Sequence, residues 1–137
     1  DLRARKFLKN TGLDYQHGTG HGVGFFLNVH EGPQGITKFN KIKLEEGMIL
    51  SNEPGYYKEG KFGIRIENLL YIKKENKKLI FENLTLAPIE KDLINFKKLN
   101  NVEKDYLFKY HLDVYGKISK YLNNNEKKWL ASHIYHF

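Results

Sequence analysis

The segment His17-Gly-Thr-Gly-His-Gly-Val-Gly24 limits what this chain can fold into more than any other feature. Four glycines in eight residues are too many for a stable helix, because each costs about 1 kcal/mol relative to alanine. On extended backbone, side chains four residues apart lie on the same face, which would bring the rings of His17 and His21 together. The glycines would also let a neighbouring strand or a substrate backbone approach closely.

The remaining sequence predicts an α+β order: the end of a helix, then strands, then helices. Residues 2–10 indicate the last turns of a helix, with Gly12 where its C-cap would lie. We expect strands at Phe25–Val29, Met48–Glu53 and about Phe62–Ile72, and one or two more over Leu79–Phe81 and Leu84–Leu86. The Pro54-Gly55 pair suits the centre of a type II turn, Gly60 lies in a short polar loop, and a lysine-rich turn precedes Leu79.

Residues 100–137 have the spacing of helices rather than of strands. Apolar residues recur every four positions from Val102 to Leu122 (Val102, Tyr106, Tyr110, Val114, Ile118 and Leu122). This spacing predicts one amphipathic helix that begins near Asn101, and Trp129, Leu130 and Ile134 indicate a last short helix. The organisation is therefore strand-rich over residues 12–90 and helical over 100–137.

Candidate metal ligands gather near the predicted strand ends. Pro54 holds Glu53 in extended backbone, and strand alternation puts Arg65 and Glu67 on one face. His30 follows the strand predicted at Phe25–Val29. Three histidines and two glutamates with no cysteine form the ligand set expected for Mn, Co or Zn, so the residues indicate a metallohydrolase. Each carboxylate also has a plainer interpretation, as an exposed strand residue.

Charge and hydropathy do not favour nucleic-acid binding or a membrane span. The net charge is +7, but the lysines occur as scattered pairs, which indicates a solvated surface rather than nucleic-acid binding. The sequence contains no run of 18 apolar residues, so it predicts no membrane span. The first residues lack Met and an apolar signal core, which predicts a piece of a longer chain. His111, His133 and His136 are interpreted as structural or surface residues.

Several motifs in order resemble one known family. They are His17-Gly-Thr-Gly-His-Gly-Val-Gly24, Phe26-Leu-Asn-Val-His-Glu-Gly-Pro33, Glu46-Gly-Met48, Asn52-Glu-Pro-Gly-Tyr-Tyr57, Phe62-Gly-Ile-Arg-Ile-Glu-Asn68 and Phe81-Glu-Asn-Leu-Thr-Leu-Ala-Pro-Ile89. Together they resemble aminopeptidase P, the Xaa-Pro aminopeptidase of the pita-bread (creatinase/aminopeptidase) metallopeptidases, in its cytosolic three-domain form. The resemblance covers most of residues 12–90 and implies that residues 1–137 are the C-terminal part of the catalytic domain.

The resemblance also implies roles. His21, Glu53 and Glu67 match metal ligands, with Glu67 bridging two divalent ions, Mn being preferred and Zn or Co being alternatives. His17 and His30 match histidines that contact substrate, and Tyr57 and Arg65 match residues that organise the site. The implied substrates are peptides with proline in the second position. The implied parent is a cytoplasmic homodimer with no nucleic-acid or membrane partner.

One departure from the family pattern limits this interpretation. The family uses two further aspartate ligands before the histidine, and here only Asp1 and Asp14 precede His21, outside the family's aspartate motif. We therefore expect the isolated fragment to be inactive. Alternatives are a prolidase or methionine aminopeptidase of the same fold, and a binding module that keeps the fold without catalysis.

Overall fold

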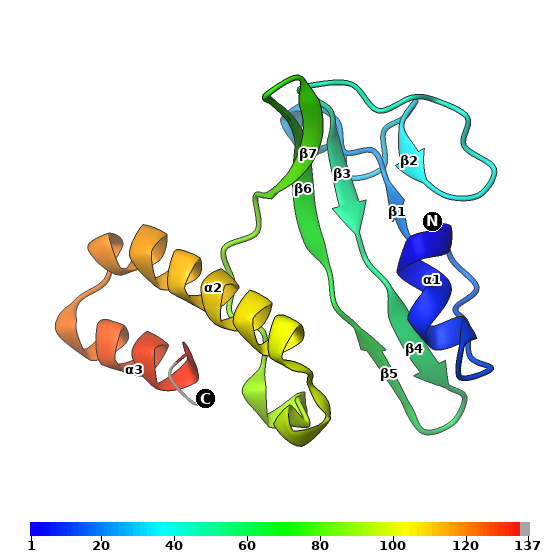
Figure 1. Ribbon diagram of the computed structural model, residues 1–137. Helices are drawn as coiled ribbons and strands as arrows, with labels where there is room; N and C mark the ends of the chain where they lie inside the picture. The colour runs from blue at the N-terminus through cyan, green and yellow to red at the C-terminus, as the bar shows by residue number, and fades with distance from the viewer. Residues whose placement is uncertain (135–137) are drawn as a thin grey trace. The chain divides into compact units, whose positions relative to one another are not determined.

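The chain divides into two compact units, Asp1–Thr85 and Leu86–Phe137 (Figure 1). The structure is a computed structural model that describes residues 1–134, with the backbone alone for Leu27; His136 lies outside the described residues. The first unit is built from antiparallel strands and the second from helices, which confirms the expected α+β class. No helix among residues 1–134 is long and apolar enough to cross a membrane.

The first unit is centred on a three-stranded antiparallel sheet in the order β3-β6-β7. Its strands are β3 (Ile49–Asn52), β6 (Asn68–Glu75) and β7 (Lys78–Asn83). Leu50, Leu70 and Ile72 are buried in its core. The turn between β6 and β7 has left-handed backbone at Asn76 and Lys77, so the lysine-rich turn is confirmed. The strand expected at Leu84–Leu86 is wrong, because β7 ends at Asn83.

A second antiparallel pair, β4 (Gly55–Lys58) and β5 (Phe62–Arg65), continues the line of β3 and β6 (Figure 1). The single strand predicted over Phe62–Ile72 is therefore wrong, because residues 66 and 67 separate β5 from β6. The break lies opposite Pro54, which has no N–H to give to a ladder.

The type II turn predicted at Pro54-Gly55 is also wrong. Gly55 is paired with Arg65 and is not among the glycines with positive φ, whereas such a turn needs positive φ at its third position. The chain instead reverses near Gly60, whose φ is +67°. Glu53 therefore lies inside a long, interrupted hairpin and not at its tip.

The glycine-rich segment, residues 17–24, forms no helix, as predicted, but it is extended only in part, because the backbone bends at His17 and Thr19. It contains β1 (Gly20–His21), which pairs with β2 (Gly35–Ile36), and it follows α1 (Leu2–Lys9). Beyond α1, Gly12 has a φ of +77°, as expected for the end of a helix.

The strand predicted at Phe25–Val29 is wrong. A 3-10 turn, η1 (Phe25–Leu27), stands there with left-handed backbone at Phe26. Phe25 and Phe26 are 82% and 89% exposed. Among the described residues no strand pairs with this run. The backbone N–H of Glu31 bonds back to the Gly22 carbonyl, so the run lies within a closed loop.

The second unit begins with two 3-10 turns, η2 (Lys91–Leu93) and η3 (Phe96–Lys98). The helix α2 (Asn101–Ile118) follows, then η4 (Ser119–Tyr121) and α3 (Asn124–Ile134). Asn100 caps α2 in a reciprocal bond with Glu103, one residue before the predicted start.

The apolar stripe predicted along the tail is only partly correct. Val102 and Tyr106 are exposed, while Leu107, Tyr110, His111 and Val114 are buried. A strict spacing of four drifts around a helix of 3.6 residues per turn, so the first residues of the stripe leave the buried face. Leu122 lies beyond α2, and Leu130 and Ile134 of α3 are buried as expected.

Candidate metal centre and active site

His21 and Glu53 form the centre of the candidate site. His21 Nε2 lies 3.2 Å from Glu53 Oε1, and the Glu53 side chain is only 8% exposed. His21 Nδ1 lies 2.9 Å from the Gly22 carbonyl oxygen, which can only accept a hydrogen bond. Neutral His21 therefore carries its proton on Nδ1 and turns the Nε2 lone pair toward a carboxylate. Two electron-pair donors that face each other in this way fit a shared cation.

Two neighbours fix the Glu53 carboxylate. Ser51 donates its hydroxyl to Oε1 at 2.8 Å and accepts the backbone N–H of His21 at 2.9 Å. Arg65 Nη1 donates to Oε2 at 2.7 Å. Each carboxylate oxygen thus has one donor from the protein, which orients the group without closing off the side that faces His21.

Arg65 also links Glu53 to His17. Its Nε donates to the Tyr57 hydroxyl at 2.7 Å, and that hydroxyl lies 2.8 Å from His17 Nε2. His17 Nδ1 lies 2.7 Å from the carbonyl oxygen of Gly18, so in the neutral ring Nδ1 donates and Nε2 accepts from Tyr57. The Tyr57 hydroxyl raises the pKa of Arg65, and the charges of Glu53 and Glu67 raise it further.

Glu67 faces Glu53 across the interrupted hairpin. Asn52 pairs with Asn68 and Gly55 with Arg65, and this one register sets Glu53 opposite Glu67. Opposite side chains share a face of an antiparallel pair, with Cβ atoms about 5 Å apart in regular strands. Glu67 is nevertheless exposed.

His30 lies on the other side of His21. The centroids of the two rings are 4.1 Å apart, and His30 is exposed. It reaches this place on the loop that follows η1, and not at the end of a strand as predicted.

The donor set fits a metal ion in part. Two ligands ~2.1 Å from one cation and at right angles are ~3.0 Å apart, close to the 3.2 Å between His21 Nε2 and Glu53 Oε1. Among residues 1–134, however, no three histidine, cysteine or acidic side chains come together as a metal-binding group. The chain itself supplies a pair of donors, with Glu67 on the facing segment between β5 and β6.

Several residues at the site escaped the sequence analysis. Ser51 is fully buried and bridges His21 and Glu53. The sequence placed Arg5 only in a helix end and set Asp1 aside as an aspartate outside the family motif, yet both residues contact the segment that carries His17. Their spacing of four on a helix was a usable signal for an ion pair, but not for its target.

Comparison with known proteins shows the family to which the chain belongs. Residues 1–74 match the model of metallopeptidase family M24, and residues 77–137 match that of the C-terminal region of peptidase M24. The chain belongs to metallopeptidase family M24.

Within that family, several similar proteins are named Xaa-Pro aminopeptidase. A probable Xaa-Pro aminopeptidase P of Pyrenophora tritici-repentis is 47% identical over 136 residues, covering 91% of this chain and 23% of that protein. The crystal structure of the X-prolyl aminopeptidase from Caenorhabditis elegans, described as a cytosolic enzyme with a di-nuclear active site, covers the whole chain with a TM-score of 0.90 and 38% identity.

A prolidase from Pyrococcus horikoshii is more distant, with a TM-score of 0.56 and 35% identity over 69% of this chain. The chain covers 24% of the Caenorhabditis enzyme and 25% of the prolidase. It thus spans about a quarter of the length of each of these relatives.

Proposed function

We propose that this chain is the C-terminal part, residues 1–137, of the catalytic domain of an Xaa-Pro aminopeptidase. The parent enzyme would remove the first residue from peptides with proline second. The observation that carries the proposal is the 3.2 Å approach of His21 Nε2 to Glu53 Oε1, with Arg65 holding the other oxygen of Glu53. The similarity to enzymes named Xaa-Pro aminopeptidase supports the substrate class.

The metal ligands of this chain are His21, Glu53 and Glu67, and the ions are two divalent cations, with Mn as the preferred metal and Zn or Co as alternatives. The di-nuclear site of the Caenorhabditis enzyme supports the number. When bound, such ions polarise the scissile carbonyl and lower the pKa of the attacking water. Two aspartates from outside this chain complete the ligand set.

The other residues act on substrate and protons. Glu53 takes a proton from the attacking water and passes it to the proline nitrogen. His30 lies beside His21 and donates a hydrogen bond to the oxygen on which negative charge develops, contributing ~2.7–4 kcal/mol. His17 contacts substrate while its two ring nitrogens bond Gly18 and Tyr57. Tyr57 and Arg65 hold the side chains of His17 and Glu53 in fixed positions through their hydrogen bonds. The parent acts as a cytoplasmic homodimer on peptides, without nucleic-acid or membrane partners.

The test uses the full-length protein and a pair of matched variants. E53Q keeps the size of the side chain but removes its charge, and we expect it to lower kcat/KM on an Xaa-Pro-Pro tripeptide by at least about a hundredfold, or 2.7 kcal/mol. E59Q makes the same change at an exposed glutamate in the β4–β5 turn and should keep wild-type activity. Equal activity of both variants would contradict the proposal.

Substrate choice separates the alternatives. Cleavage of an Xaa-Pro dipeptide in preference to the tripeptide would indicate a prolidase, and binding without any cleavage would indicate a module that has lost catalysis.

The isolated chain should be inactive and should bind divalent metal weakly, because it holds three of five ligands. Calorimetry that showed tight binding of two Mn ions to residues 1–137 alone would contradict the assigned ligand set.

A further inference from the structure

A buried ion pair at the start of α1 lies beneath the glycine-rich segment. Arg5 Nε donates to both oxygens of Asp1, at 2.8 and 3.0 Å. The side chains of Arg5 and Asp1 are only 11% and 6% exposed. Their burial sets them apart from Arg3 on the same helix, which is exposed.

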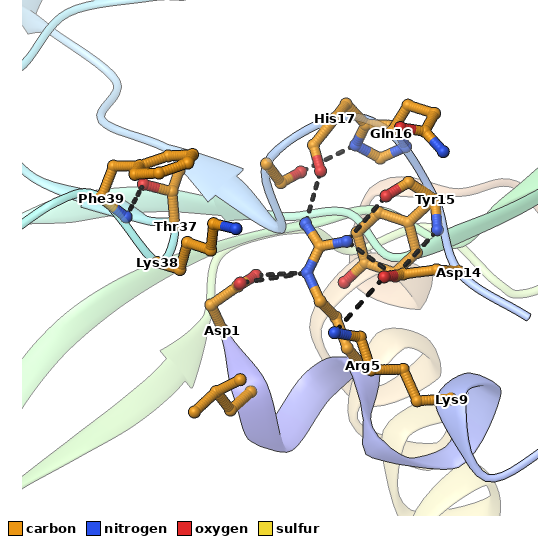
Figure 2. A pocket seen from close by; sticks show the side chains of 12 residues that line it. Asp1, Arg5, Lys9, Asp14, Tyr15, Gln16, His17, Thr37, Lys38 and Phe39 are labelled. Carbon is orange, nitrogen blue, oxygen red and sulfur yellow. Dashed lines mark hydrogen bonds and ion pairs between the residues drawn. The ribbon is translucent and has the colours of Figure 1, made fainter.

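Arg5 uses the rest of its guanidinium to hold the chain that leads to His17. Nη2 donates to the carbonyl oxygen of His17 at 2.6 Å, and Nη1 donates to the carbonyl oxygen of Tyr15 at 2.7 Å and to Asp14 at 2.8 Å (Figure 2). The guanidinium carbon also lies 4.0 Å from the centre of the Tyr15 ring, which in turn lies 4.8 Å from the His17 ring. A planar fork of five N–H groups can make these bonds together, and the single ammonium of lysine cannot.

Asp1 reaches the metal side of the site through Thr19. The Thr19 hydroxyl donates to Asp1 Oδ1 at 2.6 Å, and the Thr19 side chain is fully buried. The carbonyl oxygen of Thr19 accepts the backbone N–H of Glu53 at 2.8 Å. One ion pair is therefore connected, by two short paths, to the backbones of His17 and Glu53.

We propose that Asp1 and Arg5 are positioning residues, which set the backbone of residues 15–19 and so fix His17 relative to Glu53. This inference rests on the proposed function, since it assigns the pair to the alignment of the same active site. Neither residue contacts substrate or metal. Their effect is carried by backbone atoms, so sub-ångström losses of alignment are expected rather than loss of a reacting group.

A pocket of about 310 Å³ borders Arg5 and gives a route to test this idea. Its lining includes Asp1, Arg5, Tyr15 and His17, with Lys38 and Phe39 at the other side (Figure 2). If Arg5 is truncated, a guanidinium ion from solution can enter through this pocket and take the place of the missing group.

The experiment compares R5K and R5A with R3K and R3A in the full-length metal-loaded protein. We expect R5K to lower kcat on an Xaa-Pro-Pro tripeptide by roughly tenfold to a hundredfold, since misplacement by 1 Å can cost about a hundredfold. KM should change by about threefold at most, because substrate contacts remain. Added guanidinium should restore part of the kcat of R5A in a saturable way and leave R3A and wild type unchanged.

Hydrogen exchange measured by mass spectrometry gives a readout that needs no turnover. In R5K, exchange should rise within residues 13–24 and at Glu53, and stay at wild-type rates in β6 and β7. Wild-type kcat and exchange in R5K would overturn the proposal. So would faster exchange throughout residues 1–85 without guanidinium rescue, because the pair would then support the fold in general.

Failure of the proposed function would look different. Wild-type protein would then not cleave Xaa-Pro peptides at all. The exchange pattern of R5K would still decide whether the ion pair positions residues 15–19.

Discussion

Gly20 is the position where one added methyl group should do most damage to the site. A Cβ at this residue would overlap the carbonyl oxygen of Ser51 and lie 2.8 Å from its carbonyl carbon. Carbon atoms pack at ~3.5–4.0 Å, so β1 must move by at least about 0.7 Å away from β3. Neither strand can yield easily, because the added Cβ is fixed to the backbone of β1 and the atoms it meets belong to the backbone of β3.

The movement would separate the two halves of the candidate metal site. His21 follows Gly20 directly and donates its N–H to Ser51, and Glu53 donates its N–H to Thr19. Overpacking of this kind costs ~1–3 kcal/mol of stability. For G20A we expect a fall in kcat/KM of about a hundredfold, since displacements near 1 Å cost that much, and weaker divalent metal binding.

The matched control is G116A. Gly116 lies inside α2, and an added Cβ meets no atom within 4 Å. Alanine should therefore stabilise the second unit by about 0.5–1 kcal/mol through helix propensity, with no effect on activity. Steady-state kinetics on a tripeptide and calorimetric metal titration of both full-length variants measure the contrast. Wild-type activity and metal affinity in G20A would show that the close contact between Gly20 and Ser51 does not set the distance between His21 and Glu53.

Three further predictions concern other parts of the chain. R65K should lower kcat by at least about tenfold, because one ammonium cannot hold a carboxylate and a phenol in fixed directions as the guanidinium does; tripeptide kinetics check this. Burial lowers the pKa of His111, whose Nε2 accepts the N–H of Ile89, so the unfolded second unit binds the proton more tightly than the folded one. The contribution of this group to stability should be complete above the unfolded pKa of about 6.5 and should fall as the pH drops toward the folded pKa. Hydrogen exchange in α2 against pH should show this loss in wild type but not in H111L. N100A should destabilise the second unit by about 1 kcal/mol through loss of the helix cap, whereas N101A should have little effect on its thermal unfolding.

Local patterns in the sequence correctly predicted the strands β3 and β7 and the helices α2 and α3. Four glycines in eight residues excluded a helix at His17–Gly24, and the chain there forms bends and the short strand β1 instead. The asparagine and glutamate at 100 and 103 cap α2 within one residue of the expected start. These features depend on neighbours close in sequence, whose preferences a linear pattern expresses directly.

The errors came from residues whose partners lie far along the chain. Phe25–Val29 is rich in apolar residues, but within residues 1–134 no strand pairs with it, and Phe25, Phe26 and Val29 are exposed in a loop. Pro54-Gly55 has the composition of a turn, yet Gly55 is held in a ladder by Arg65. Pairing of this kind overrides local preference, because a strand is stable only with a neighbour.

The sequence by itself determined which residue types are available as metal ligands, since a chain without cysteine offers only histidines and carboxylates for tight divalent binding. It also determined that no helix forms around His17 and His21. Only the tertiary structure decided that His21 meets Glu53 at 3.2 Å, that Arg65 joins Glu53 to Tyr57 and His17, and that Asp1 and Arg5 lie beneath them. Those distances join residues that lie between 8 and 40 positions apart in the sequence, where strand register, loop closure and packing, rather than local preference, choose the partner.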